Sequence, residues 1–203
     1  YRKLLPAPKL LKRTLLEKID REIEMHKEKG GGLIQFKMNA LDDADIVKRL
    51  YLACQAGVRV DLFIRDSCRF RPGMPGLSET ARVVSIVGRF LEHSRLYYFR
   101  NGGQEEYFIG SADSMKRNLE SRVEVLVPIE ARSLRDELRV LLDTHDADYR
   151  SAWQMQPDGS YIQRMPKDDT DGRGLHQLLI DQAVKSARTA QRMRRRLGKV
   201  IRS

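Results

Sequence analysis

The sequence contains little cysteine and no long apolar run. Its 203 residues include two cysteines, too few for the disulfide framework of a small secreted domain. No stretch approaches the roughly 18 apolar residues that a membrane-spanning helix requires. Charged residues throughout 1–12 exclude a secretory signal peptide. These absences predict a soluble protein of a reducing, cytoplasmic compartment. Because the sequence begins with Tyr1 and not with methionine, we expect it to be a fragment of a longer protein.

The net charge of +10 is unevenly distributed along the chain. Residues 182–203 hold eight Lys and Arg and no acidic residue, so the rest of the chain is nearly neutral. The overall basicity therefore does not indicate that the folded body binds nucleic acid. Between Arg59 and Arg100 all eight basic residues are arginine, whose planar fork can hold two phosphate oxygens at once. This bias favours fixed phosphate recognition over diffuse charge.

The first half of the chain has the pattern of an α/β fold. Apolar residues spaced four apart predict an amphipathic helix over 10–29, which the glycines at 30–32 end. The apolar runs at 33–38 and 58–64 predict strands, with a helix over 46–54 between them. A strand, a helix and a strand in this order make a βαβ unit, whose two strands are parallel.

The second half of the chain predicts further strands, a hairpin and two helices. The Asn-Gly-Gly turn at 101–103 indicates a hairpin. A helix follows from about Ala131, and the residues after Trp153 have a turn-rich composition. Residues 167–174 resemble a linker, and residues 174–203 predict one basic helix. The predicted strands cover residues 82–87, 96–99, 107–109 and 123–127.

Three positions are candidates for phosphate chemistry. Arg65 directly follows the strand at 58–64, at the carboxyl end where open α/β sheets bind ligands, although a solvated or ion-paired surface arginine also fits this position. His93 and Arg95 lie on one face of an extended segment, which would join a nucleophile or general acid to a phosphate anchor; a structural imidazole is the alternative. The Gly110-Ser111 turn could hold an anion with its backbone amides, or be a tight turn alone.

The order of these features resembles a known superfamily. His-x-Arg at 93–95, Gly-Ser-Ala-Asp at 110–113 and a strand containing Glu124 follow one another as in phospholipase D-like phosphotransfer domains. The stretch Ser-Ile-Val-Gly-Arg-Phe-Leu-Glu-His-Ser-Arg at 85–95 is similar to the signature of bacterial polyphosphate kinase, in its C-terminal, second phospholipase D-like catalytic domain. The resemblance covers about Leu4 to Arg164. Further stretches that match the same family lie at 37–39, 55–58, 71–73, 75–78, 111–113 and 117–119.

The resemblance implies a fold, a reaction and a set of residues. The fold would be a phospholipase D-like mixed α/β sheet flanked by helices over residues 1–166, followed by a linker and a basic helical tail over 167–203. The reaction would be the reversible transfer of the terminal phosphate of ATP to polyphosphate, with Mg²⁺. Arg65 and Arg122 match phosphate-binding positions of the family, and His93 matches its catalytic histidine near the ATP phosphates. Expected partners are ATP or ADP, polyphosphate, the preceding domains of the same enzyme and further copies in a homo-oligomer.

The sequence also departs from the family pattern. The family's phosphohistidine nucleophile, its nucleotide-binding tyrosine and its metal-binding arginines belong to preceding domains and match no segment here. We therefore expect no metal ligand in this chain and no turnover by the chain alone. Asp66 and Ser114 replace the family's usual residues, and pairing of Asp66 with Arg65 would weaken the hold of Arg65 on phosphate. The other histidines are expected at surface or helix positions: His26, His145 and His176.

Two other functions remain open from the sequence. A phospholipase D-like phosphodiesterase acting on lipid or nucleic acid would have to work as a dimer, because the chain holds one motif; such enzymes usually have lysine where Arg95 stands. A polyanion-binding module would use the cationic tail, which is equally consistent with a solvated helix end or a disordered segment. The tail could also contact anionic lipid, which would place the protein at the inner membrane face. Its candidate contact residues are Arg188, Arg192, Arg194, Arg195, Arg196, Lys199 and Arg202.

Overall fold

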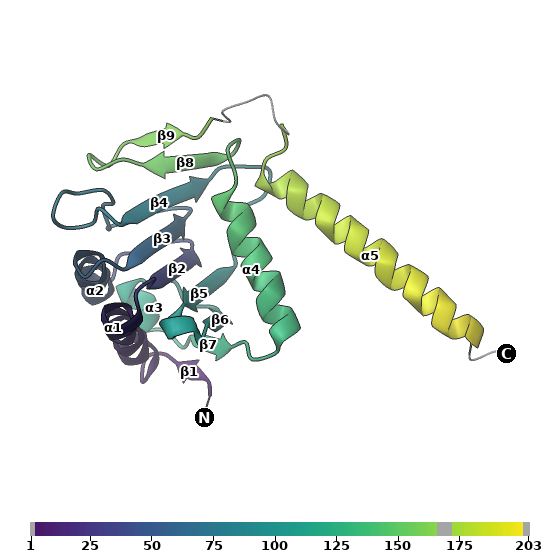
Figure 1. Cartoon of the computed structure of the whole chain (residues 1–203), viewed down its shortest axis with the longest axis horizontal. Coiled ribbons are helices and arrows are strands. Elements are labelled where there is room, and N and C mark those ends of the chain that lie inside the picture. The colour runs from purple at the N-terminus through teal and green to yellow at the C-terminus, as the bar shows by residue number, and fades with distance from the viewer. Residues whose placement is uncertain (1–2, 166–171, 201–203) are drawn as a thin grey trace.

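The chain forms one mixed β-sheet with helices on both faces (Figure 1). The computed structural model describes residues 3–165 and 172–200, with side chains up to residue 192. In these residues the strand order is β1-β7-β6-β5-β2-β3-β4-β8-β9. The strands are β1 (Leu5–Pro6), β2 (Leu33–Met38), β3 (Arg59–Ile64), β4 (Ala81–Ile86), β5 (Arg95–Phe99), β6 (Glu106–Gly110), β7 (Val125–Pro128), β8 (Ala152–Met155) and β9 (Tyr161–Gln163). The helices are α1 (Leu11–Lys29), α2 (Ala44–Gln55), α3 (Lys116–Glu120), α4 (Arg132–Asp146) and α5 (Leu175–Val200), with a 3₁₀ turn at Asn101–Gly103.

The predicted βαβ unit forms the centre of the sheet. β2 and β3 pair in parallel, and α2 connects them. α2 begins after Asp43, whose carboxylate accepts hydrogen bonds from the backbone amides of Asp45 and Ile46. β4 pairs in parallel with β3, whereas β5 pairs antiparallel with β2 on the other side. The carboxyl ends of β2 and β3 therefore meet at one edge, the position at which open α/β sheets bind ligands.

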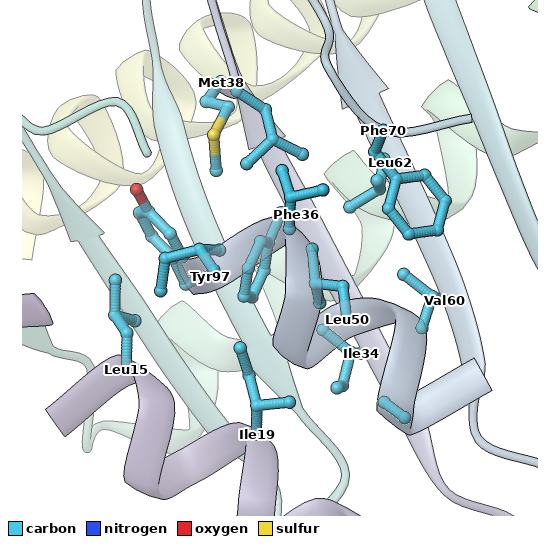
Figure 2. Packing of buried hydrophobic residues seen from close by; sticks show 14 of the residues in the cluster. Leu15, Ile19, Ile34, Phe36, Met38, Leu50, Val60, Leu62, Phe70 and Tyr97 are labelled. Atoms are coloured by element: carbon cyan, nitrogen blue, oxygen red, sulfur yellow. The ribbon is translucent and has the colours of Figure 1, made fainter. Parts of the chain in front are cut away.

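Each face of the sheet has its own apolar core. On the side of α1 and α2, alternate residues of β2 pack against both helices, as Figure 2 shows for Phe36 and Met38. On the side of α4, residues of β3 to β6 cluster with Leu142 of that helix. The alternation of side chains along β2 places Lys37 on the α4 face, where it is buried. A buried ammonium group requires a charged partner, which bears on the candidate site.

Five elements were not predicted or have other bounds than predicted: β1, α3, β7, β8 and β9. β8 and β9 form a hairpin at one edge of the sheet, in the region predicted to be turn-rich. Both strands are short and the turn at Asp158 and Gly159 dominates the composition between them, which is why no strand was predicted. The strand predicted over 123–127 begins only at Val125, and Val123 is 92% exposed. β1 was not predicted either, because two residues give no periodicity.

Helix α5 projects away from the sheet (Figure 1). Leu175 and His176, in its first turn, are buried, whereas the side chains of residues 181–192 are all exposed. The predicted basic helix is confirmed over 175–200. The predicted linker lies mostly outside the described residues, and the domain boundary after residue 166 stays a prediction. None of the described helices is long and apolar enough to cross a membrane.

Candidate functional site

A cavity of about 790 Å³ lies at the edge of the sheet where β2 and β3 end. Asn39 directly follows β2 and Arg65 directly follows β3. β5 begins at the same edge with Arg95, which pairs with Gly110 at the end of β6. The topology therefore brings together residues that are distant in the sequence, at the predicted place. The lining residues are Asn39, Ala40, Arg65, Asp66, Ser67, His93, Arg95, Gly110, Ser111, Asp113, Met115, Arg117, Asn118, Arg122 and Glu124.

All three predicted site residues, Arg65, His93 and Arg122, line this cavity. Arg65 is half-buried, and its Nη1 donates a hydrogen bond of 3.0 Å to the backbone carbonyl of Glu92. His93 and Arg122 are exposed. Among the described residues the guanidinium of Arg122 has no hydrogen-bond or ion-pair partner, and Arg65 has that one contact. Most of their donors are therefore available to an anion in the cavity.

Arg95 is held by an acidic partner and is not a free phosphate anchor. Its Nε and Nη2 donate to the two carboxylate oxygens of Asp113 over 3.1 and 2.9 Å. Its Nη1 donates to the backbone carbonyl of His93 over 2.8 Å and lies 3.1 Å from the Nδ1 of that ring. The two side chains of the ion pair are 10% and 8% exposed. The predicted role of phosphate anchor therefore changes: Arg95 orients His93 while Asp113 fixes Arg95.

The Gly110-Ser111 turn does not offer the free amides that were predicted. The backbone amide of Ser111 donates to the carbonyl of Val125, and its hydroxyl accepts from the amide of Val125. These bonds join the end of β6 to β7. Glu124, predicted within a strand, lies just before β7, where it accepts a hydrogen bond of 2.8 Å from Asn118. The alternative of a tight structural turn is the one that the geometry supports.

Asp66 does not pair with Arg65, contrary to the concern raised by the sequence. Asp66 is exposed and lines the cavity, and its backbone amide donates to the carbonyl of Asn39 over 2.8 Å. Among the described residues no ion pair joins its carboxylate to Arg65. Asp66 therefore does not compensate the charge of Arg65, which is available to a ligand.

Two features of the site were missed by the sequence analysis. Arg117, in the first turn of α3, is exposed and adds a further guanidinium to the cavity. The family-like stretch at 117–119 could have identified Arg117 as a site residue. His145 lies in α4 and His176 in α5, which are helix positions as expected, but both side chains are buried, at 0% and 7% exposure. Both contact Glu92, the neighbour of His93. Only helical periodicity around each histidine could have indicated burial.

The carboxylates of the cavity differ in how far they are engaged. Asp113 is held by Arg95 and by the backbone amide of Asn39, whereas Asp66 is exposed. Among the described residues the cluster of three acidic residues close enough to hold a metal ion is Asp43, Asp45 and Glu120, which lies outside the cavity. Lys12 already pairs with all three of its carboxylates.

The fold of the chain resembles that of a phospholipase D family member. Nuc from Salmonella typhimurium, a phospholipase D family member, matches 76% of this chain and 97% of its own with a TM-score of 0.56. Its sequence identity is 15%, so the likeness concerns the fold alone. The predicted mixed α/β sheet of this class is confirmed.

The chain belongs to the polyphosphate kinase family, since the model of polyphosphate kinase C-terminal domain 2 matches residues 4–173. Polyphosphate kinase of Thermosynechococcus vestitus is 49% identical over 185 residues, which are 91% of this chain and 25% of that protein. The polyphosphate kinase of Pseudomonas aeruginosa is 43% identical over 94% of this chain and 28% of its own length. The crystal structure of polyphosphate kinase from Porphyromonas gingivalis matches 93% of this chain and 28% of that chain, with a TM-score of 0.85 at 35% identity. The chain thus spans about a quarter of the length of these relatives, and the family predicted from the motifs is confirmed.

Proposed function

We propose that the chain is the C-terminal catalytic domain of a polyphosphate kinase. It would contribute ATP- and polyphosphate-binding side chains to the reversible transfer of the terminal phosphate of ATP to polyphosphate. The observation that supports this most directly is the convergence of Arg65, His93 and Arg122 on one cavity. The phosphohistidine nucleophile would come from a preceding domain of the same enzyme, and copies of that enzyme would form a homo-oligomer.

The cavity residues suit phosphoryl transfer because this reaction spreads negative charge over phosphate oxygens. Cationic donors that are already in place stabilise that charge without reorganisation. Arg65 would hold the nucleotide phosphates with the donors that Glu92 does not use, and Arg122 would hold a further phosphate. His93, oriented through Arg95, would present its imidazole to the phosphates and donate or accept a proton during transfer.

A divalent cation, Mg²⁺ in this proposal, would offset phosphate charge when it is bound with the nucleotide. Its protein ligands would lie in the preceding domains of the enzyme, as the family resemblance implies. This chain would supply only the surrounding positive charge.

The remaining proposals concern location and the tail. We assign residues 1–166 to the catalytic domain and 167–203 to a linker and a cationic helix. In a cytoplasmic enzyme that helix would contact polyphosphate or, at the inner membrane face, anionic lipid. The exposed side chains of Lys185, Arg188 and Arg192 support a polyanion contact.

A dimeric phospholipase D-like phosphodiesterase is the second candidate, and the fold shared with Nuc favours it. The commitment of Arg95 to Asp113 speaks against it, since the lysine usual at this position would be needed for substrate phosphate. Hydrolysis of bis-nitrophenyl phosphate by the chain, lost in His93→Ala, would replace the kinase proposal with this one.

Calorimetric titration tests the proposed site. ATP and tripolyphosphate are titrated into the chain, an Arg65→Ala, His93→Ala double variant and an Arg69→Ala control. Arg69 is an exposed arginine of the same loop that does not line the cavity. We expect the double variant to lose about tenfold or more in affinity, since charge-assisted hydrogen bonds to phosphate are removed, and the control to bind like wild type. Equal binding by all three proteins would refute the site assignment.

A further inference from the structure

The loop that carries His93 is held from behind by a buried cluster. Glu92 directly precedes His93, between β4 and β5, and its carboxylate lies on the α4 side of the sheet with three basic side chains. Its Oε2 lies 3.1 Å from the Nζ of Lys37 on β2 and 3.1 Å from the Nε2 of His145 on α4. Its Oε1 lies 3.5 Å from the Nε2 of His176 on α5. One carboxylate therefore joins the loop to three separate elements.

The members of this cluster are shielded from water. Lys37, His145 and His176 are 3%, 0% and 7% exposed. Lys37 also donates a hydrogen bond of 2.8 Å to the hydroxyl of Ser94, on the other side of His93. In the described part of the chain Glu92 is the one carboxylate paired with Lys37 or His145. Because a buried charge is costly without a partner, removing the Glu92 charge would leave cations uncompensated behind the site.

The backbone of the same residue reaches the cavity. The carbonyl of Glu92 accepts the hydrogen bond from Arg65, and with its amide nitrogen turned toward this carbonyl, the orientation that its neighbours favour, Asn39 would donate to it over 3.2 Å. The next carbonyl, of His93, accepts from Arg95. Glu92 is therefore the point at which the buried cluster meets two of the phosphate-site residues.

The ring of His145 lies between two oxygen atoms. Its Nδ1 lies 2.8 Å from the carbonyl oxygen of Leu141, and its Nε2 lies 3.1 Å from the carboxylate of Glu92. His176 differs, because its Nδ1 accepts from the backbone amide of Phe90 and its Nε2 faces Glu92. The two imidazoles therefore attach the Glu92 carboxylate to α4 and to α5.

The charges around Glu92 keep its carboxylate ionised. Burial by itself raises the pKa of Glu92, but the hydrogen bond and charge of His145, together with Lys37, outweigh it and hold the pKa at about 2. Burial lowers the pKa of Lys37 against the opposing effect of Glu92. Arg65 and Arg95 approach the same loop from the cavity side. The carboxylate is therefore ionised at neutral pH, and its charge compensates the buried ammonium of Lys37.

We propose that Glu92 is a positioning residue for the phosphate site: its carboxylate, paired with Lys37, His145 and His176, sets the place of His93 and Arg65. This inference rests on the proposed function. Loss of the Glu92 charge would release the loop from β2 and α4, and the loop would shift at the two carbonyls to which Arg65 and Arg95 donate. Glu92→Gln keeps the shape of the side chain and removes its charge.

The test uses the full-length enzyme with Glu92→Gln, His145→Gln and the control Asp61→Asn. Asp61 is a buried carboxylate of β3 on the same face, paired with Arg82 and Arg59, and does not line the cavity. We expect both cluster variants to lower kcat about tenfold or more while KM for ATP changes little, because misplaced catalytic groups affect the transition state most. The control should lower Tm without this selective loss of kcat.

Histidine ¹⁵N NMR of the 203-residue chain separates this inference from the proposed function. The His93 signals should move in Glu92→Gln and in His145→Gln and stay in Asp61→Asn. An inactive full-length wild type would refute the proposed function and leave this readout valid. Wild-type kcat and wild-type His93 signals in Glu92→Gln would refute the positioning role. If Asp61→Asn changed kcat and the His93 signals as much as Glu92→Gln does, the cluster would contribute to stability only.

Discussion

At the scale of single residues, the partners of each guanidinium distinguish the arginines of the cavity. Arg95 makes a two-point contact with Asp113 and is 10% exposed, so its charge is already compensated. Arg65 makes one contact with a carbonyl, and Arg122 has no polar partner among the described residues. Arg82 likewise pairs with buried Asp61. The arginines between residues 59 and 100 therefore serve two purposes: some pair with buried carboxylates, and others present free donors to the cavity. Composition predicts phosphate chemistry in this region, but burial and pairing decide which arginines are available for it.

Replacing Arg95 with lysine tests its role as a positioning residue. A lysine ammonium is a point charge and cannot bind both oxygens of Asp113 while also reaching the carbonyl of His93. We expect Arg95→Lys to lower the free energy of unfolding by about 2 kcal/mol in urea titrations. The exposed helical pair of Arg139 and Asp143 provides the control, for which Arg139→Lys should cost less than about 0.5 kcal/mol. Wild-type stability of Arg95→Lys, or new phosphodiesterase activity, would contradict this role.

At the scale of elements, the floor of the cavity depends on how closely β6 approaches β7. A Cβ atom at Gly110 would lie 2.1 Å from the backbone carbonyl oxygen of Val125 and 3.0 Å from the Cα of Leu126. Backbone atoms cannot move aside as a flexible side chain can. Glycine is therefore required at the end of β6, next to the bonds between Ser111 and Val125.

Gly110→Ala should separate β6 from β7 and deform the cavity. We expect a loss of about 3 kcal/mol in the free energy of unfolding, because overpacking here moves two backbones. Phosphate affinity should fall as well, since Ser111, Asp113 and Arg122 are displaced. Gly172→Ala is a suitable control, because its Cβ would meet only the flexible Arg150 guanidinium at 3.2 Å. Equal urea midpoints for Gly110→Ala and Gly172→Ala would show that β6 and β7 can move apart without loss of stability, which would contradict the requirement for glycine at position 110.

The sequence predicted those elements whose apolar pattern is long enough to be periodic. The βαβ unit, α1, α4 and the hairpin at 101–103 all follow from spacing or turn residues, and each is confirmed. β1 and the β8–β9 hairpin consist of two to four residues and depend on pairing with distant strands, which no local pattern records. The candidate site was predicted through its cationic residues. The cluster around Glu92 was not, because its histidines come from α4 and α5 and only the tertiary fold joins them to β2.

At the scale of the whole molecule, the positive charge is divided between two places. The cavity concentrates arginines on a nearly neutral body, and α5 carries exposed basic side chains away from it (Figure 1). The N-terminal end of α5 is anchored, through Leu175 and Leu179 at the core of the α4 face and His176 beside Glu92. Stability and polyanion contact should therefore depend on different parts of one helix.

Two truncations separate these roles. Removing residues 182–203 deletes side chains that are exposed from 182 to 192, so the free energy of unfolding should change by less than about 0.5 kcal/mol. Removing residues 175–203 also deletes buried Leu175 and should cost about 3 kcal/mol, measured by urea titration. If the tail contacts polyphosphate, the shorter deletion should weaken polyphosphate binding and make its salt dependence shallower, because fewer counterions are released. Unchanged affinity and salt slope would exclude the tail from polyphosphate binding, whereas equal stability of the two truncations would show that the first turn of α5 does not anchor the helix.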